Sequence, residues 1–254
     1  CGVCSDSSGN LLFYSNGIRI FNHLNQLMEN GDTINPGQVW ENIEQQGYPN
    51  PMRTLSLPAP GQSNVYYFFY IGFYLLPGSG TFSPFYYSLV NMNDNGGAGK
   101  VLSKNQIVLE GDFAEPDAVK HANGRDWWII LPVDSIPVYH VFLLDQSGLH
   151  GPFTQTSGDP ADFPQESDWT QFSPNGEFFV RNGSDGMCFY DFNRCTGELS
   201  NPRYWPRSIH GYSSGPMVFS PDSRFLYVNN SSFVVQFDLS AGEIGFASMD
   251  TVQR

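Results

Sequence analysis

Short runs of apolar and aromatic residues alternate with polar segments along the whole chain. The runs at residues 65–71 and 138–145 are almost entirely apolar, and clusters of Gly, Pro, Asn, Asp and Ser flank them. Runs of this length with such boundaries are typical of strands, and the lack of alternation indicates strands buried on both faces. The same pattern predicts strands at residues 11–14, 18–22, 85–92 and 127–131.

Two stretches in the second half of the chain carry one pattern twice. The segment FSPNGEFFVRNGSDGMCFYDFNRCTG begins at Phe172 and FSPDSRFLYVNNSSFVVQFDLSAG begins at Phe219, an offset of 47 residues. Each reads as a strand, a turn containing Pro, a second strand, a polar turn and a third strand that ends near a Gly. A period of roughly 40 to 50 residues made of short strands is typical of a β-propeller, in which each repeat forms one four-stranded blade.

Less regular copies of this unit precede the two clear ones. We therefore predict an all-β chain that forms a single β-propeller domain over residues 1–254, with about five four-stranded antiparallel blades. The fifth blade has barely reached its fourth strand at Arg254. We expect the domain to be incomplete at one or both ends and to belong to a ring of six or seven blades.

Composition and charge narrow the range of partners. The chain has 21 Phe, 13 Tyr, 26 Gly and 18 Pro, which supplies both strand formers and turn formers. Its 12 Lys and Arg against 25 Asp and Glu give a formal net charge of -13, which repels phosphate backbones. We expect no nucleic acid partner, and no membrane insertion because no apolar run is long enough to span a bilayer.

The four cysteines are Cys1, Cys4, Cys188 and Cys195, and they can pair in three ways that their spacing does not separate. A disulfide between Cys188 and Cys195 across a turn fits an exported protein. Cys1 is either the lipid-bearing first residue of a bacterial lipoprotein or a residue from the middle of a longer chain.

The segment HANGRDWW, residues 121–128, has the densest functional chemistry. An imidazole, a guanidinium, a carboxylate and an indole could together grip a sugar or a peptide. The candidate ligand-binding residues are therefore His121, Arg125, Asp126 and Trp127.

A structural interpretation of the same segment competes with the functional one. In it, Asn123 and Gly124 form a hairpin turn, the neighbouring Arg and Asp either pair with each other or bind the backbone, and both Trp side chains wedge between blades. Asp191 and Asp238, which occupy the same position in adjacent blades, are likewise predicted to bind turn amides rather than to act as a catalytic pair.

We expect no metal, no cofactor and no catalytic residue. The five His residues lack any metal-binding spacing, and the chain has no nucleophile elbow, phosphate loop or dinucleotide fingerprint.

Several segments together resemble a known family. SDSSGNLLFYSNGIRIFNHLNQLMENGD, KHANGRDWWII, YDFNRCTGELSN and FSPDSRFLYV are similar to the propeller region of large secreted proteins of gliding bacteria, which often carry a gliding-motility-associated sorting domain for type IX secretion. FSPD followed by LYV also occurs in WD40-like and lactonase-like propellers. The resemblance implies an extracellular or cell-surface location and further domains in a larger parent chain, and it implies no catalytic residues.

These observations favour an exported, non-catalytic binding or scaffold module whose ligand is a protein or a glycan. The alternative is a propeller enzyme of the lactonase or lyase type with its site at the central channel, since a fold alone does not settle function.

Overall fold

The computed structural model describes residues 2–37, 40–41, 54–72, 74–75, 81–160, 169–184, 186–206, 215–229, 234–240 and 249–252. Its internal contacts divide the chain into two compact units, and each is described by itself below. The first unit comprises Cys1–Phe113 with Asp145–Gly148, and the second comprises Ala114–Leu144 with Leu149–Arg254. Within the described ranges, no helix is long and apolar enough to cross a membrane.

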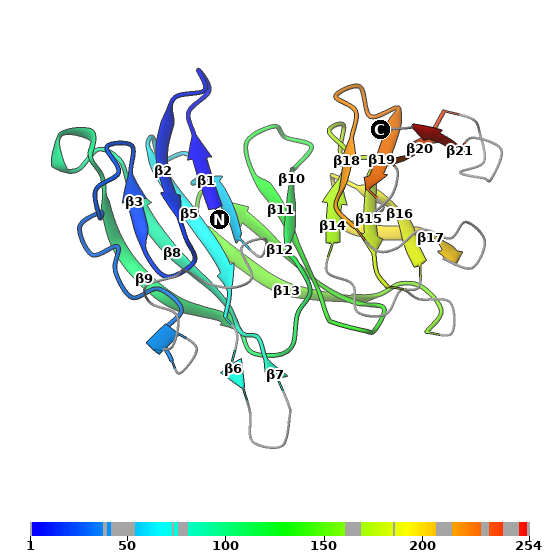
Figure 1. Ribbon diagram of the computed structural model, residues 1–254, viewed down its shortest axis with the longest axis horizontal. Coiled ribbons are helices and arrows are strands. Elements are labelled where there is room, and N and C mark those ends of the chain that lie inside the picture. The colour runs from blue at the N-terminus through cyan, green and yellow to red at the C-terminus, as the bar shows by residue number, and fades with distance from the viewer. Residues whose placement is uncertain are drawn as a thin grey trace. The chain divides into compact units, whose positions relative to one another are not determined.

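The first unit contains two larger sheets and one small hairpin (Figure 1). The first sheet consists of β1 (Gly2–Ser5), β2 (Leu11–Ser15) and β3 (Ile20–Asn22). The second consists of β4 (Thr54–Pro58), β5 (Val65–Ile71), β8 (Phe85–Asn91) and β9 (Lys100–Leu109). The small hairpin of β6 (Tyr74–Leu75) and β7 (Thr81–Phe82) lies between β5 and β8 in sequence, and the short 3-10 helix η1 (Asn95–Gly97) precedes β9.

The second unit contains three sheets of four strands each (Figure 1). They are β10 (Asp117–Lys120), β11 (Trp127–Pro132), β12 (Val138–Asp145) and β13 (Gly148–Thr156); β14 (Trp169–Phe172), β15 (Phe178–Asn182), β16 (Gly186–Asn193) and β17 (Glu198–Pro206); and β18 (Met217–Phe219), β19 (Phe225–Asn229), β20 (Val234–Asp238) and β21 (Met249–Val252).

All five large sheets are antiparallel meanders in which the spatial order of the strands equals their order in the chain. This is the blade pattern of a β-propeller, so the all-β propeller prediction is confirmed. The described part of the first blade holds three strands, and one of them, β1, was not predicted from the sequence.

The apolar strands of the second unit bury both of their faces, as their sequence predicts. On β15, Phe179 belongs to a core cluster with residues of the preceding blade, whereas its neighbour Val180 belongs to a cluster with residues of the following blade. On β16, Tyr190 belongs to the cluster shared with the preceding blade and Phe189 to the cluster shared with the following blade. The blade of β14 to β17 is therefore held between its two neighbours in the second unit by residues that alternate along each of these strands.

The two repeats also share the hydrogen bonds of their first turn. In the SPNG turn, the Gly176 N–H donates to the Ser173 carbonyl and the Phe178 N–H donates to Ser173 Oγ at 2.9 Å. In the SPDS turn, the Ser223 N–H donates to the Ser220 carbonyl and the Phe225 N–H donates to Ser220 Oγ at 2.8 Å. Every bond recurs at the offset of 47 residues, so the repeat in sequence is a repeat in structure.

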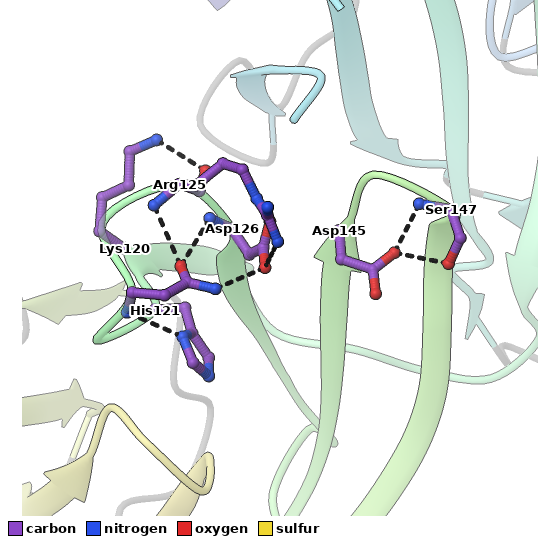
Figure 2. Close-up of polar contacts among 7 residues, drawn as sticks. Lys120, His121, Arg125, Asp126, Asp145 and Ser147 are labelled. Atoms are coloured by element: carbon purple, nitrogen blue, oxygen red, sulfur yellow. Dashed lines mark hydrogen bonds and ion pairs between the residues drawn. The ribbon is translucent and has the colours of Figure 1, made fainter. Parts of the chain in front are cut away.

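Asp191 and Asp238 lie at the same register position, opposite Phe178 and Phe225 respectively. Asp238 accepts a hydrogen bond from the N–H of Ser240 at 3.0 Å, as predicted, and Asp145 makes the same kind of turn with Ser147 at 2.7 Å (Figure 2).

Asp191 departs from that expectation. Its carboxylate pairs with Arg203 Nη2 on the adjacent strand at 2.6 Å. The reason is that β16 continues for two residues beyond Asp191, which moves the turn out of reach of its carboxylate.

The predicted disulfide between Cys188 and Cys195 is absent from the structure, where both thiols are free. Cys188 is buried in the middle of β16, opposite Tyr204, whereas Cys195 is exposed in the turn that follows the strand. Extended chain from Cys188 to the strand end at Asn193 spans about 17 Å, and a disulfide requires Cα atoms within about 7 Å of each other.

Candidate functional site

The hairpin between β10 and β11 is formed by the HANGRDWW segment. The Gly124 N–H donates to the His121 carbonyl at 2.9 Å, and the His121 N–H donates to the Asp126 carbonyl at 2.9 Å. Gly124 has a φ of 74°, a left-handed conformation that Gly adopts without a steric cost. Asn123 and Gly124 therefore make the tight turn of the structural interpretation.

Asp126 is the centre of a polar network inside this turn. Its carboxylate accepts from Arg125 Nε at 2.7 Å, from Arg125 Nη2 at 2.9 Å and from Asn123 Nδ2 at 2.6 Å. Figure 2 shows these contacts together with the bond of 3.1 Å from Lys120 Nζ to the Arg125 carbonyl. The Asp126 residue is only 4% exposed. Arg125 and Asp126 thus satisfy each other within the hairpin.

Arg194, in the turn between β16 and β17 of the next blade, fastens the hairpin to its neighbour. Its guanidinium donates to the carbonyls of Lys120 at 2.8 Å, Asn175 at 3.0 Å and His121 at 3.4 Å. Its own carbonyl accepts from Trp128 Nε1 at 2.9 Å. All three acceptors are neutral main-chain groups, so the guanidinium charge has no carboxylate partner in the part of the chain that the structure describes.

A pocket of about 290 Å³ lies between β10 and β14, the first strands of two successive blades. We call it the β10–β14 pocket. The side chains used in the argument below are Asp117, Lys120, Trp127, Gln171, Phe172 and Arg194. Its lining brings together two cations, a carboxyl group, an amide and an indole.

Two polar atoms on residues that line this pocket are buried and have no hydrogen-bond partner among the described residues. They are the indole Nε1 of Trp127, a donor, and the amide Oε1 of Gln171, an acceptor. Leaving such an atom unpaired costs about 1–3 kcal/mol. Both atoms are shielded from solvent, so a molecule in the pocket does not reach them in this structure.

Asp117 lies at the start of β10 and links the two blades. Its Oδ2 accepts from the Phe172 N–H at 2.6 Å and its Oδ1 accepts from the Ala118 N–H at 2.8 Å. Burial of the carboxyl group raises the pKa of Asp117 to about 6, although these two hydrogen bonds act to lower it.

Lys120, at the end of the same strand, is the second cation of the pocket. Its Nζ lies 3.8 Å from the centroid of the Trp127 ring, and burial lowers the pKa of its ammonium group.

Of the four predicted ligand-binding residues, Trp127 lines the pocket and the other three make contacts within the hairpin and its neighbouring Trp128. Trp127 lines the β10–β14 pocket, whereas Arg125 and Asp126 bind each other in the hairpin. The His121 ring packs against Trp128 with the ring centroids 5.5 Å apart, and its Nδ1 accepts from the Asn123 N–H at 3.0 Å. Trp128 is wedged in the core shared by two blades, as the structural interpretation predicted, but Trp127 is not.

Sequence reasoning missed Asp117, Lys120, Gln171 and Arg194. Lys120 and Arg194 lie in segments that carry the family resemblance, but the resemblance implies no role for them, and Gln171 and Arg194 are distant in sequence from the hairpin. The one available signal was the repeat itself, because equivalent first strands of successive blades are expected to lie side by side.

The antiparallel blades and their shared cores define this chain as a β-propeller protein. Neither a protein-family model nor a curated protein matches its sequence. The chain is similar in structure to a candidate 6-phosphogluconolactonase from Bacteroides uniformis ATCC 8492, with a TM-score of 0.52 and 14% identity over 99% of this chain and 78% of that chain.

It is also similar to the β-propeller domain of Cps50 (Swd1) from Myceliophteria thermophila, with a TM-score of 0.54 and 9% identity over 99% of this chain and 72% of that chain. A functionally unknown protein from Desulfotomaculum acetoxidans DSM 771 gives a TM-score of 0.42 and 14% identity over 79% of this chain, which spans 65% of that protein's chain. At these identities the first two similarities establish the β-propeller fold alone.

Proposed function

We propose that this chain is a non-catalytic binding module, exported to the bacterial cell surface or beyond it, that holds a protein or glycan ligand at the β10–β14 pocket. The observation that carries the proposal is the lining of this pocket, which sets the side chains of Lys120 and Arg194 beside the indole ring of Trp127. Ligand sites characteristically combine an apolar surface with a few directed polar groups.

The hairpin supports the same proposal because it forms a rigid frame for the pocket. Its polar groups are used internally, so it holds Trp127 and Lys120 in place without offering its own Arg125 and Asp126 to a ligand. Arg194 joins this frame to the next blade through three main-chain carbonyls. A pocket wall fixed in this way favours binding by lowering the entropy lost when the ligand is held.

Export rests on the resemblance of the sequence to secreted propellers of gliding bacteria. On this proposal the parent chain carries further domains and reaches the surface by type IX secretion. Immunodetection on intact cells of the source organism, compared with a strain whose type IX secretion is disabled, tests the route. Surface signal that persists in the disabled strain would refute it.

Binding is tested by applying the purified chain to a glycan array and by using it as bait for proteins of its own organism. We expect a specific ligand whose binding weakens in a Lys120→Gln variant and is unchanged in an Arg203→Gln variant. Silence in both experiments would refute the binding function.

An enzyme of the lactonase or lyase type is the second candidate. The favouring observation is Asp117, because a pocket carboxyl with a pKa of about 6 is suited to general acid–base catalysis. Against it, both carboxylate oxygens already accept main-chain hydrogen bonds, one from Ala118 within β10 and one from Phe172 that joins β14 to β10. Hydrolysis of sugar lactones that is lost in an Asp117→Asn variant would favour the enzyme over the binding module.

A further inference from the structure

We propose that copies of this chain associate head to tail. The contact joins the free face of the first sheet, β1–β3, of one copy to the free face of the last sheet, β18–β21, of the next copy. Each of these sheets buries one face against the neighbouring sheet of its own unit. The opposite face of each carries a row of mostly apolar side chains that are partly or largely exposed.

The free face of the first sheet carries a continuous row across its strands, which we call the first-sheet row. Val3 of β1 lies opposite Tyr14 of β2, which lies opposite Phe21 of β3. Phe21 in turn forms a β-bridge with Leu27. Residues directly opposite on antiparallel strands share one face of the sheet, and the Tyr14 and Phe21 rings stack with their centroids 5.3 Å apart. Val3 is 62% exposed and Leu27 is 49% exposed, so both ends of the row face solvent.

The free face of the last sheet carries a similar row, which we call the last-sheet row. Val218 of β18 lies opposite Tyr227 of β19, and Tyr227 lies opposite Gln236 of β20. Phe225 lies on the same face, with its ring centroid 6.3 Å from that of Tyr227. Val218 is 54% exposed, and the other three side chains are partly exposed.

The repeat indicates what kind of surface covers such a row. At the offset of 47 residues, Tyr227 and Gln236 correspond to Val180 and Phe189 of the preceding blade. Those two side chains are buried in the core cluster where the blade of β14 to β17 packs against the sheet that follows it. The last-sheet row therefore occupies a position that the following blade covers elsewhere in the second unit, and the face of another sheet is the surface that fits it.

A second copy of the chain supplies such a face. The first sheet packs Phe13 and Ile20 against the sheet that follows it, so its free face is the one that a later blade turns toward the blade before it. The last sheet is free on the opposite side, toward a following blade. The two rows are thus the two halves of one blade-to-blade contact. Because these halves differ, the contact is heterologous and continues from copy to copy unless a ring closes.

The oligomeric state of the purified chain tests the proposal. Sedimentation velocity over a range of concentrations should show a mass that rises beyond that of one chain. Each copy carries a net charge of -13, so copies repel each other, and salt screens this repulsion. Association should therefore strengthen from low to high salt, as expected for an apolar contact between chains of like charge.

Two substitutions each place a carboxylate in one of the rows, namely Val3→Asp and Val218→Asp. We expect each to weaken self-association about tenfold, a loss equal to about 1.4 kcal/mol. Both native side chains are more than half exposed, so the variants should remain folded, which circular dichroism checks.

Ile107→Asp on β9 and Phe153→Asp on β13 are the matched controls. They add the same charge at exposed apolar positions outside both rows and should leave association unchanged. Equal weakening by these controls would overturn the proposal, because it would show that added charge alone disperses the chains.

A mixture of Val3→Asp and Val218→Asp identifies the pairing of the faces. The first variant keeps an intact last-sheet row and the second keeps an intact first-sheet row, so the mixture should form a complex of two chains that grows no further. If the native chain associates but the mixture does not, the contact is not between the two rows and the proposal is wrong. A native chain that stays monomeric at every concentration and salt would also overturn it, and would favour further blades of a longer chain as the occupants of both faces.

Discussion

Asp117 carries a carboxyl group whose proton affinity is set by burial more than by its hydrogen bonds. The folded state raises its pKa from 3.8 to about 6, so between these pH values the folded chain binds a proton that the unfolded chain releases. A carboxyl group whose pKa is raised in the folded state stabilises the fold at a pH below its pKa in the unfolded state. This contribution is lost as the pH rises through about 6.

We therefore expect the side-chain carbon resonance of Asp117 to titrate with a midpoint near 6. The free energy of unfolding should fall between about pH 4 and pH 6 in the native chain, and this step should be missing in Asp117→Asn. Chemical denaturation across that pH range measures it. A midpoint near the ordinary aspartate value would show that the carboxyl group is better hydrated than the structure indicates.

Trp127 and Trp128 are adjacent in sequence, but their indole nitrogens differ in hydrogen bonding and so in their contribution to the free energy of unfolding. Trp128 Nε1 donates to the Arg194 carbonyl, and Trp128 is buried, whereas Trp127 Nε1 has no partner within the described ranges. We expect Trp128→Phe to lower the free energy of unfolding by about 2 kcal/mol. Trp127→Phe should change it by less than about 1 kcal/mol, since it removes an unpaired donor. Urea denaturation compares the two, and equal losses would contradict the assignment.

At the scale of the element, the turns after β14 and β18 show how one position of the repeat accepts two different residues. Gly176 has a φ of 74° and the equivalent Ser223 has a φ of 62°. The left-handed conformation is thus kept while the residue changes. Ser223 gains a compensating contact, because its Oγ accepts from the Asn175 N–H of the neighbouring blade at 2.9 Å.

A Gly176→Ala substitution should lower the free energy of unfolding by about 2 kcal/mol. The left-handed backbone alone costs about 1–2 kcal/mol for a residue with a Cβ, and the new Cβ would meet Arg194 Cδ at 2.5 Å. At the equivalent position, Ser223→Gly relieves the same strain but loses one hydrogen bond, so its effect should stay within about 1 kcal/mol. Thermal unfolding of both variants measures the contrast, and a neutral Gly176→Ala would show that this turn can rearrange.

Arg181 links two blades through the core. It is fully buried, and it donates to the carbonyls of Ile136 at 3.0 Å and Val133 at 2.8 Å, in the connection between β11 and β12. Removing it leaves these acceptors buried and opens a cavity, so Arg181→Ala should cost about 3–5 kcal/mol.

The partly exposed pair of Arg203 with Asp191 serves as the control, and Arg203→Ala should cost no more than about 1 kcal/mol. Guanidinium denaturation of the two variants provides the comparison. Similar losses would mean that the buried guanidinium contributes nothing beyond an ordinary surface charge.

At the scale of the whole molecule, the net charge of -13 dominates encounters with other polyelectrolytes. We expect no binding of duplex DNA or RNA by fluorescence anisotropy at low salt, because a phosphate backbone is repelled by this charge. Micromolar affinity that weakens steeply with salt would contradict this expectation and would point to a local basic surface strong enough to outweigh the total charge.

The sequence made much of the fold predictable for a physical reason. A strand buried on both faces shows up as an unbroken apolar run, and turn residues such as Pro174 and Gly176 have local conformational preferences that need no tertiary context. The offset of 47 residues then follows from repeating one blade. The strand β1 was missed because GVCS lacks any such run and pairs only through its neighbour β2.

The sequence by itself therefore determined the apolar strands, the blade period and the hairpin turn at Asn123 and Gly124, because each depends on residues close together in the chain. Only the tertiary structure decided which charges stay unpaired and which of two adjacent Trp side chains enters the core. Those outcomes depend on the blade that packs alongside. It supplies Gln171 and Arg194 to the pocket, and it buries Trp128, whereas the Trp127 indole nitrogen has no partner in the part of the chain that the structure describes.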